Sequence, residues 1–453
     1  MLVISETKPT YKAYALNNFR NIPQIERLSE SERRAIEIVG HVLPFKVNNY
    51  VIDELIDWDN YYEDPIFNLV FPNKQMLRPE HFAEMAQTMR QTDDRNAIRD
   101  TAHGIRLQLN PHPAGQVELN VPEIDGVKLM GVQHKYRETV LFFPSSGQTC
   151  HSYCTFCFRW PQFVGMNEIK FAMRETELLV KYLEQHQEAT DILFTGGDPM
   201  IMKFDVFRQY IEPFLDKNNK TNIQSIRIGT KSLGFWPYKF IDDEEADKYL
   251  QLFEQVVKSG INLAFMAHFN HPNELRTPAV QKAIRRLRRT GLQIRTQSPL
   301  LRHINDNPLA WAEMWREQVN QNCIPYYMFV ARDTGAKHYF EVPLVRAWDI
   351  FRNAYQRVSG LCRTVRGPSM SATPGKVQIL GVAEVGAQKV FAMRFLQGRN
   401  PDWVARPFFA QYDEKATWLD DLKPAFSDKF FYEDELQAMY AQRVKDEQIP
   451  VLG

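Results

Sequence analysis

The sequence predicts an α/β fold, in which a partial (β/α)6 barrel lies between a helical N-terminal extension and a C-terminal extension. Between about residues 134 and 330, six short apolar runs alternate with segments that have the 3.6-residue apolar period of amphipathic helices. Strand and helix repeating in this order are typical of a parallel sheet with right-handed crossovers. Six such units leave one side of the barrel open, where a substrate can enter.

The 453 residues divide into three expected regions. Residues 1–130 form a mainly helical region, in which Ser29–Glu32 has the pattern of a capping box and Gly40 marks the expected helix end. No motif in this region points to chemistry. The barrel is expected at 131–345, and a C-terminal region that ends in an aromatic tail is expected at 346–453.

Six strands are expected in the middle region, and each is followed by a turn or a helix. They cover Thr139–Pro144, Asp191–Thr195, Ser225–Gly229, Asn262–Ala267, Leu292–Thr296 and Pro325–Val330. Helices are expected at 245–259 and after Pro278. The second of these carries arginines that are expected to form a solvated face, namely Arg285, Arg286, Arg288 and Arg289.

Composition and charge argue against several classes of protein. The 55 basic and 55 acidic residues cancel, so no nucleic-acid surface is expected. No run approaches 18 apolar residues, so no membrane-spanning helix is expected, and the N-terminus lacks the pattern of a signal peptide. A reducing, cytoplasmic location is therefore expected, in which Cys323 and Cys362 are packed thiols.

The most informative motif comprises Cys150, Cys154 and Cys157, which directly follow the first expected strand. Iron–sulfur clusters normally take four cysteines. Three thiolates at this spacing can hold three irons of a [4Fe–4S] cluster and leave the fourth iron open. A Cys₃His zinc site with His151, or a set of buried thiols, is the alternative. The cluster is favoured because His151 adjoins Cys150, and only Cys154 and Cys157 have a zinc-type spacing.

The order and spacing of further motifs resemble the lysine 2,3-aminomutase family of the radical S-adenosylmethionine superfamily. The matching segments are His134–Tyr136, Asp191–Pro199, Arg227–Thr230, His268–Glu274, Gln297–Asp306, Pro325–Tyr327 and Pro374–Lys376. The resemblance implies a partial barrel of the radical SAM type and an isomerase. In that family, a 5′-deoxyadenosyl radical and an imine of pyridoxal 5′-phosphate move the α-amino group of an amino acid to the β-carbon. An electron donor must reduce the cluster.

The resemblance also implies where S-adenosylmethionine binds. The open iron would take its amino and carboxylate groups, and the surrounding residues would be Gly196, Gly197, Asp198, His268 and Gln297. The two glycines would allow a close approach of the backbone to the methionyl amino group. Asp198 is equally suited to accept a hydrogen bond at this site or to cap a helix.

Lys376 stands where the family forms a Schiff base with pyridoxal 5′-phosphate, which is ordinary nucleophilic chemistry for a lysine. Lys135 and Tyr136 are expected near the same cofactor. The family carries two arginines in this stretch, and here those positions are Lys135 and Thr139. A lysine offers positive charge to a phosphate, although it lacks the bidentate fork of arginine.

Substrate binding is expected at Arg159, Arg332 and Ser369. Arg159 matches the family arginine that pairs with the α-carboxylate. The lysine enzymes hold the distal ammonium between two aspartates, and the matching positions here are Arg332 and, by a less secure count, Ser369. Arg332 would repel an ammonium, which favours an acidic or polar substrate such as glutamate. Asp333 would restore lysine binding if the loop shifts.

Several alternatives stay open at this point. They are a lysine 2,3-aminomutase proper, a radical SAM enzyme without pyridoxal phosphate, and a non-catalytic iron–sulfur or zinc protein. The C-terminal region from 381 contains no cysteine, so no zinc site is expected there. Its aromatic tail is expected to pack over the barrel or onto a neighbouring subunit of a homo-oligomer.

Overall fold

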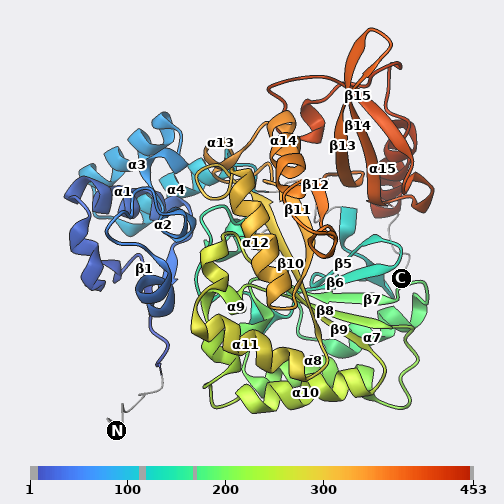
Figure 1. Cartoon of the computed structure of the whole chain (residues 1–453), viewed down its shortest axis with the longest axis horizontal. Helices are drawn as coiled ribbons and strands as arrows, with labels where there is room; N and C mark the ends of the chain where they lie inside the picture. The colour runs from blue at the N-terminus through green and yellow to red at the C-terminus, as the bar shows by residue number, and fades with distance from the viewer. Residues whose placement is uncertain (1–8, 112–118, 167–170, 449–453) are drawn as a thin grey trace.

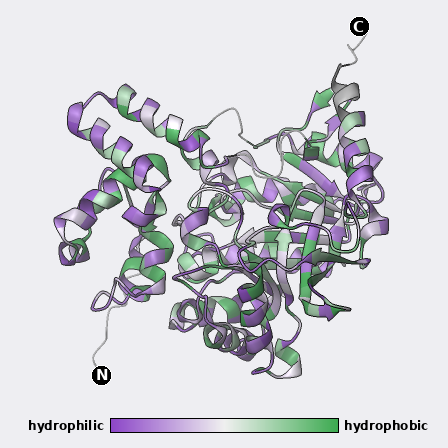
Figure 2. Cartoon of the chain, turned by 90° about the horizontal axis from the view of Figure 1, so that it is seen from above, coloured by the Kyte–Doolittle hydropathy of each residue, from purple (hydrophilic) through white to green (hydrophobic). Residues whose placement is uncertain are grey.

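The computed structural model describes residues 9–111, 119–166 and 171–448. A helical N-terminal part, a central sheet flanked by helices, and a set of antiparallel C-terminal strands follow one another along the chain (Figure 1). Apolar residues are concentrated on the inward faces of the helices and in the central strands (Figure 2). In the described ranges, no helix is both long and apolar enough to cross a membrane.

One eleven-stranded sheet runs through the molecule, with its strands in the order β15 to β5. Six neighbours in chain order are parallel, namely β6 (Thr139–Phe142), β7 (Asp191–Phe194), β8 (Ser225–Thr230), β9 (Asn262–His268), β10 (Gln293–Leu300) and β11 (Ile324–Val330). All six expected strands are therefore present, and the α/β class is confirmed. β5 (Val132–Tyr136) pairs antiparallel with β6 at one edge.

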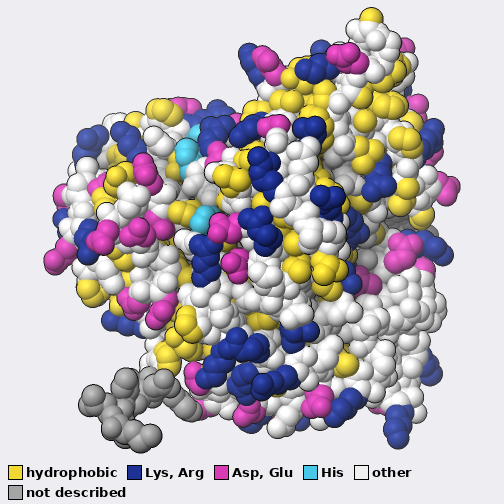
Figure 3. Space-filling model, viewed as in Figure 1, with side chains coloured by type: hydrophobic (Ala, Val, Ile, Leu, Met, Phe, Trp, Pro, Cys, Tyr) yellow, Lys and Arg dark blue, Asp and Glu magenta, His cyan; other side chains and the backbone are white. Residues whose placement is uncertain are grey.

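Helices connect and cover the parallel strands. They are α7 (Thr176–Gln185), α8 (Phe204–Leu215), α10 (Ala246–Lys258), α11 (Pro278–Arg289), α12 (Pro308–Asn320) and α14 (Leu344–Tyr355). α11 begins where the Thr277 side chain accepts a hydrogen bond from the amide of Val280. Its exposed arginines lie in the basic group over α11 in Figure 3. Arg286 is the exception, because it donates to the carbonyls of Phe240 and Ile241.

The C-terminal region differs from the expected aromatic tail. β12 (Arg366–Ser371) continues the sheet parallel to β11, and β13 (Gly375–Val385), β14 (Gln388–Gly398) and β15 (Pro407–Gln411) then pair antiparallel. The aromatic residues form a second core on these strands, with Phe395, Trp403, Phe408 and Tyr432 among its members. The expected boundary after residue 345 falls inside α14.

The N-terminal part contains α1 (Glu30–Val42), α2 (Pro65–Val70), α3 (Pro79–Gln91) and α4 (Arg95–Leu107), with a short sheet of β1 (Ala13–Ala15) and β2 (Lys46–Asn48). The capping box at Ser29 and Glu32 is present with both of its hydrogen bonds. The expected helix end at Gly40 is wrong, because α1 continues to Val42. A Cβ at Gly40 would lie 2.7 Å from Leu16 Cδ1, so this glycine makes room for packing.

Candidate active site

The three cysteines lie on a loop, residues 143–159, that leaves the carboxyl end of β6, and the N-terminal part holds this cysteine loop in place. Lys46 Nζ donates to the carbonyl of Cys150 at 2.7 Å, and the Tyr11 hydroxyl donates to the carbonyl of His151 at 2.8 Å. The amide of Tyr153 donates in turn to the carbonyl of Lys46 at 2.8 Å. A region without a chemical motif of its own therefore fixes the backbone of the cysteine loop.

The three thiols lie close enough together to influence one another. Burial raises the pKa of each thiol, that of Cys157 to about 11, and the pKa of Cys150 is raised further by Asp198, Cys157 and Cys154. A bound metal reverses this situation, because it stabilises the thiolate. Three such donors on one loop fit a [4Fe–4S] cluster with one iron left open.

A mononuclear zinc site fits less well. The His151 ring shares a hydrogen bond of 3.0 Å between Nδ1 and Ser232 Oγ, and it packs edge-on against Tyr11. Among the described residues, no group of three or more His, Cys, Asp and Glu side chains is placed to hold a single metal ion. The described side chains of His151 and the three cysteines therefore do not form a Cys₃His arrangement around one ion.

Gly196 and Gly197 let the turn after β7 pack directly against the cysteine loop. A Cβ at Gly197 would lie 2.4 Å from the carbonyl oxygen of Thr149, and a Cβ at Gly196 would lie 2.3 Å from Gln148 Nε2. The φ of Gly196 is +140°, which side chains disfavour. The amide of Gly197 donates to the carbonyl of Gly147 at 3.1 Å. The glycines thus join the β7 turn to the loop that carries the cysteines.

Asp198 is a buried hydrogen-bond acceptor at the same junction. Its carboxylate caps the helical turn at Pro199 through the amide of Met200 at 2.9 Å, and it accepts from Thr230 Oγ1 at 2.7 Å. The amide of Lys231 donates to it at 2.9 Å. Burial raises the pKa of Asp198, and these donors counteract the increase. The structure thus gives Asp198 a role in joining β7 to β8 rather than a free carboxylate.

His268 ends β9 and is the register partner of Gln297, which lies within β10. The His268 ring packs against Phe156 of the cysteine loop, with 5.8 Å between the ring centroids. Burial lowers the pKa of His268 well below its ordinary value, so its imidazole is neutral. Both residues therefore lie on the edge of the sheet that faces the cysteines.

A second group of expected residues surrounds a cavity of about 180 Å³ between β5, β6, β8, β13 and β14. Its described lining consists of Asn120, Gln133, Lys135, Tyr136, Thr139, Leu141, Phe158, Arg159, Leu193, Arg227, Arg332, Ser371, Lys376 and Gln397. Within that described lining, five side chains are those of lysine or arginine and none is acidic. The cavity is therefore suited to an anionic ligand.

Lys376 lies at the start of β13, and its amine is buried in this cavity. Nζ donates to Gln397 Oε1 at 3.1 Å and lies 4.3 Å from the centre of the Tyr327 ring. Burial lowers the pKa of Lys376 to about 7, and the charges of Arg227 and Arg366 contribute. The amine is therefore partly neutral near pH 7, as a nucleophilic lysine requires.

Arg159 and Arg332 present buried guanidinium groups with unused donors. Arg159 Nη1 and Arg332 Nε are buried and have no hydrogen-bond partner. Burial lowers the pKa of Arg159 to about 9, and Arg332 contributes. Asp333 lies 3.9 Å from Arg332 Nε, which is too far for a hydrogen bond. Donors in this state are suited to a carboxylate ligand, because an anion satisfies both the charge and the hydrogen bonds.

Arg227 supplies a guanidinium that the sequence interpretation did not assign to the site. It lies on β8 and pairs with Asp191 of β7, with 2.8 Å between Nε and Oδ1. Thr139, at the position of the missing family arginine, donates to the same carboxylate at 3.0 Å. Ile226 and Ile228 are fully buried on either side of Arg227 in the strand. The alternation of buried and less buried residues along β8 could have indicated this role, because it places Arg227 on the face opposite to Ile226 and Ile228.

No family model matches the chain. It is 29% identical to a protein of Aquifex aeolicus (strain VF5), whose name as an L-lysine 2,3-aminomutase is provisional, over 88% of this chain and 92% of that protein. It is 22% identical to the L-lysine 2,3-aminomutase of Methanococcus maripaludis over 77% of this chain and 70% of that enzyme. Identity to the glutamate 2,3-aminomutase of Clostridioides difficile is 26% over 42% of each chain.

These similarities support a lysine 2,3-aminomutase-like family for the chain. The family resemblance that the motifs predicted is therefore confirmed. Among solved structures, the radical S-adenosylmethionine methyltransferase TsrM of Kitasatospora setae matches with a TM-score of 0.29 and 11% identity, over 43% of this chain and 36% of that one. A TM-score this low carries no argument about the fold.

Ser371 lines the cavity in the place where Ser369 was expected. Ser369 is fully buried, and its hydroxyl donates to the carbonyl of Met328 at 3.4 Å. The antiparallel register of β12 and β13 places Ser371 opposite Lys376, whereas Ser369 lies opposite Gln378. Ser371 lines the cavity and Ser369 does not. Sequence counting missed this because it did not include the hairpin between β12 and β13.

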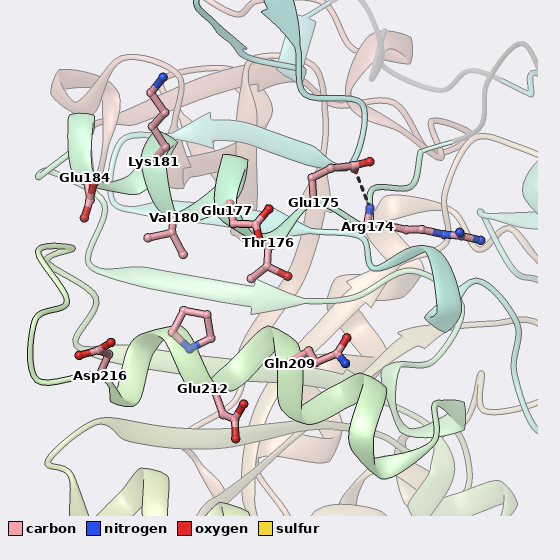
Figure 4. A pocket seen from close by; sticks show the side chains of 11 residues that line it. Arg174, Glu175, Thr176, Glu177, Val180, Lys181, Glu184, Gln209, Glu212 and Asp216 are labelled. Atoms are coloured by element: carbon pink, nitrogen blue, oxygen red, sulfur yellow. Dashed lines mark hydrogen bonds between the residues drawn. The ribbon is translucent and has the colours of Figure 1, made fainter.

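A larger hollow of about 640 Å³ lies elsewhere, between α7 and α8. Figure 4 shows that its side chains are mainly charged, with Glu177, Lys181, Glu184 and Glu212 among them. These four residues are exposed. None of the expected site residues lines this hollow, so it is distinct from the candidate active site.

We expect Gly197→Ala to weaken the junction between β7 and the cysteine loop. The added methyl would meet backbone atoms of Thr149 and would cost about 1–3 kcal/mol of unfolding free energy. The amount of iron bound after reconstitution would fall together with the stability. Gly104→Ala is the matched control, because nothing lies within 4 Å of a Cβ there and an alanine within α4 adds about 0.5–1 kcal/mol. Unchanged stability and iron content in Gly197→Ala would contradict the packing role.

The reactivity of Lys376 is expected to rise through about pH 7 in the folded protein without added cofactor. Acetic anhydride acylates only the neutral amine, so labelling of the Lys376 peptide reports deprotonation. In urea, the midpoint should move to the ordinary lysine value of about 10.4. The unfolded chain then binds more protons between these values, so the burial of Lys376 destabilises the fold less as pH rises. Equal midpoints in both states would refute the depressed pKa.

Proposed function

We propose that this protein is a radical SAM 2,3-aminomutase, an isomerase that moves the α-amino group of a small amino acid to the β-carbon. The observation that carries the proposal is the cavity in which the amine of Lys376 is buried with the unpartnered guanidinium donors of Arg159 and Arg332. The named relatives are lysine and glutamate 2,3-aminomutases, which supports the same reaction.

Cys150, Cys154 and Cys157 would hold a [4Fe–4S] cluster whose open iron takes S-adenosylmethionine. When bound, the cluster would supply the electron that generates the radical. An external electron donor would first have to reduce the cluster. Three residues would surround this ligand, namely Gly196 of the turn after β7, His268 at the end of β9 and Gln297 within β10. In this proposal the six parallel strands form a partial (β/α)6 barrel, with the ligand at their carboxyl ends.

Pyridoxal 5′-phosphate fits the residues of the cavity. When bound, it supplies a carbonyl that can hold the migrating nitrogen. Lys376 would form the covalent bond to it, because its buried amine is partly neutral near pH 7. Lys135 and Arg227 offer positive charge to the phosphate. Tyr136 and Phe158 contribute aromatic surface to the same walls and exclude water from the reacting atoms.

An acidic α-amino acid such as glutamate fits the charges of the cavity best. Arg159 would bind the α-carboxylate, and Arg332 would bind a distal carboxylate. Asp333 does not line the cavity, although its Oδ1 is buried without a hydrogen-bond partner and Asn110 Nδ2 donates to its Oδ2 at 3.3 Å. Lysine is the second candidate substrate, and the names of several relatives favour it.

Anaerobic incubation of the reconstituted enzyme with each common amino acid, analysed for β-amino products, tests the proposed reaction. Formation of a β-amino acid that requires S-adenosylmethionine and pyridoxal phosphate would support it. Absence of any β-amino product, with S-adenosylmethionine still cleaved, would favour a radical enzyme with different chemistry.

Cys154→Ala should abolish reductive cleavage of S-adenosylmethionine, because two thiolates cannot hold the cubane with one iron open. Iron content and 5′-deoxyadenosine formation under dithionite measure this. Cys362→Ala is the control, since that buried thiol lies in a short helical turn at Gly360–Cys362 and is not part of the cysteine loop. Cleavage that persists in Cys154→Ala, or that is lost equally in Cys362→Ala, would contradict the cluster assignment.

Arg332→Asp should lower activity on glutamate by about 100-fold and improve activity on lysine, because a charge reversal in a desolvated pocket costs several kcal/mol. Competition between the two amino acids gives the ratio of kcat/KM directly. Arg285→Asp makes the same charge change on the exposed face of α11 and should leave that ratio unchanged. A ratio that Arg332→Asp does not alter would remove Arg332 from substrate selection.

A further inference from the structure

We infer that Gln397 is a positioning residue for Lys376, and that its side-chain carbonyl fixes the direction of the lysine amine in the cavity. This inference rests on the proposed function, since it concerns the amine that would bond to pyridoxal phosphate. Gln397 lies on β14, outside the segments that carried the family resemblance. Its role is read from the contacts of this chain.

The backbone places the two residues opposite each other. Lys376 and Gln397 are register partners on the antiparallel strands β13 and β14, and both line the cavity. A Cβ at residue 375 would lie 2.3 Å from the carbonyl oxygen of Gln397, so Gly375 is needed for this close pairing. The glycine before the lysine therefore serves the contact between strands. It brings the Gln397 side chain within reach of the amine.

The side chains of Lys376 and Gln397 are joined by a hydrogen bond in which the lysine is the donor. Lys376 Nζ donates to Gln397 Oε1 at 3.1 Å, which is a hydrogen bond of ordinary length. The other close neighbours of Nζ are the rings of Tyr327 at 4.3 Å and Phe329 at 5.6 Å, whose faces attract a cation but define no hydrogen-bond direction. Gln397 thus supplies the directional contact of this amine in the described part of the chain.

An amide at this position has a chemical advantage over a carboxylate. It accepts a hydrogen bond from a charged or a neutral amine, whereas a carboxylate would form an ion pair and favour the charged form. The charged groups that face Lys376 from neighbouring elements are mainly cationic. They are Lys135 of β5, Asp191 of β7, Arg227 of β8 and Arg366 of β12, with Arg159 and Arg332 on the same cavity wall. Asp191 is paired with Arg227, so the environment favours the neutral amine.

Two substitutions separate the position of the amine from its charge. Gln397→Glu should move the midpoint of Lys376 acetylation by acetic anhydride upward by at least one pH unit, because the new carboxylate stabilises the ammonium. Gln397→Asn keeps the amide and shortens the side chain. It should leave the midpoint within about half a pH unit and lower the rate of capture of Lys376 by pyridoxal phosphate and borohydride about 10-fold at high pH.

Gln378→Glu is the matched control, since Gln378 is a buried glutamine of β13 that accepts from Arg394 at 3.1 Å and does not line the cavity. It should change neither measurement, and denaturation curves identify variants that fail to fold. An unchanged midpoint in Gln397→Glu, or wild-type capture in Gln397→Asn, would overturn the positioning role.

The two measurements also distinguish this inference from the proposed function. Acetic anhydride needs no cofactor. The acetylation midpoint could shift in Gln397→Glu while pyridoxal phosphate never captures wild-type Lys376. That result would support the contact between Gln397 and Lys376 and would refute the binding of pyridoxal phosphate. If pyridoxal phosphate captures wild-type Lys376 and neither Gln397 variant has an effect, the cofactor is supported and the positioning role of Gln397 is refuted.

Discussion

The burial of several cationic side chains around one cavity is the constraint on which the site depends. Moving a charged group out of water costs several kcal/mol when no partner compensates it. Asp191 compensates Arg227 with two hydrogen bonds, whereas Arg159 and Arg332 keep buried donors without partners. A fold that holds these groups in place without a ligand is less stable than it would be with an anion bound. The cavity is therefore suited to an anionic ligand.

The continuous sheet connects this cavity to the cysteine loop. Arg159 is two residues from Cys157, so the segment that carries the thiols also delivers a guanidinium to the cavity. On the other side, β13 and β14 extend the sheet beyond the parallel strands and bring Lys376 and Gln397 to the same place. In the proposed function, the cysteine loop that holds the cluster and the lysine that holds pyridoxal phosphate are thus joined through one sheet. Short strands with many hydrogen bonds position such groups more accurately than mobile loops do.

The sequence predicted the parallel part of this arrangement because its signals are local. Apolar runs, helix periods and the glycine pair at 196–197 each lie within a few residues. The antiparallel extension was not predicted, although β13 and β14 form a hairpin, because register shifts within it disrupt a regular alternation of apolar residues. The error at Ser369 has the same origin. The bracing of the cysteine loop by Lys46 and Tyr11 was also invisible, because it joins segments about a hundred residues apart.

The exchange of an arginine for Thr139 illustrates how the charge of the cavity is kept. Thr139 has no charge, but its hydroxyl and Arg227 share the carboxylate of Asp191. This shared acceptor holds the Arg227 guanidinium on the cavity wall. Arg227 of β8 therefore supplies positive charge that Thr139 of β6 does not. Lys135, whose ammonium donates to the carbonyl of Ala372 at 2.5 Å, lies across the same space. In the proposed function, Lys135 and Arg227, from different strands, would meet the phosphate, and Arg159 and Arg332 would bind the carboxylates of the substrate.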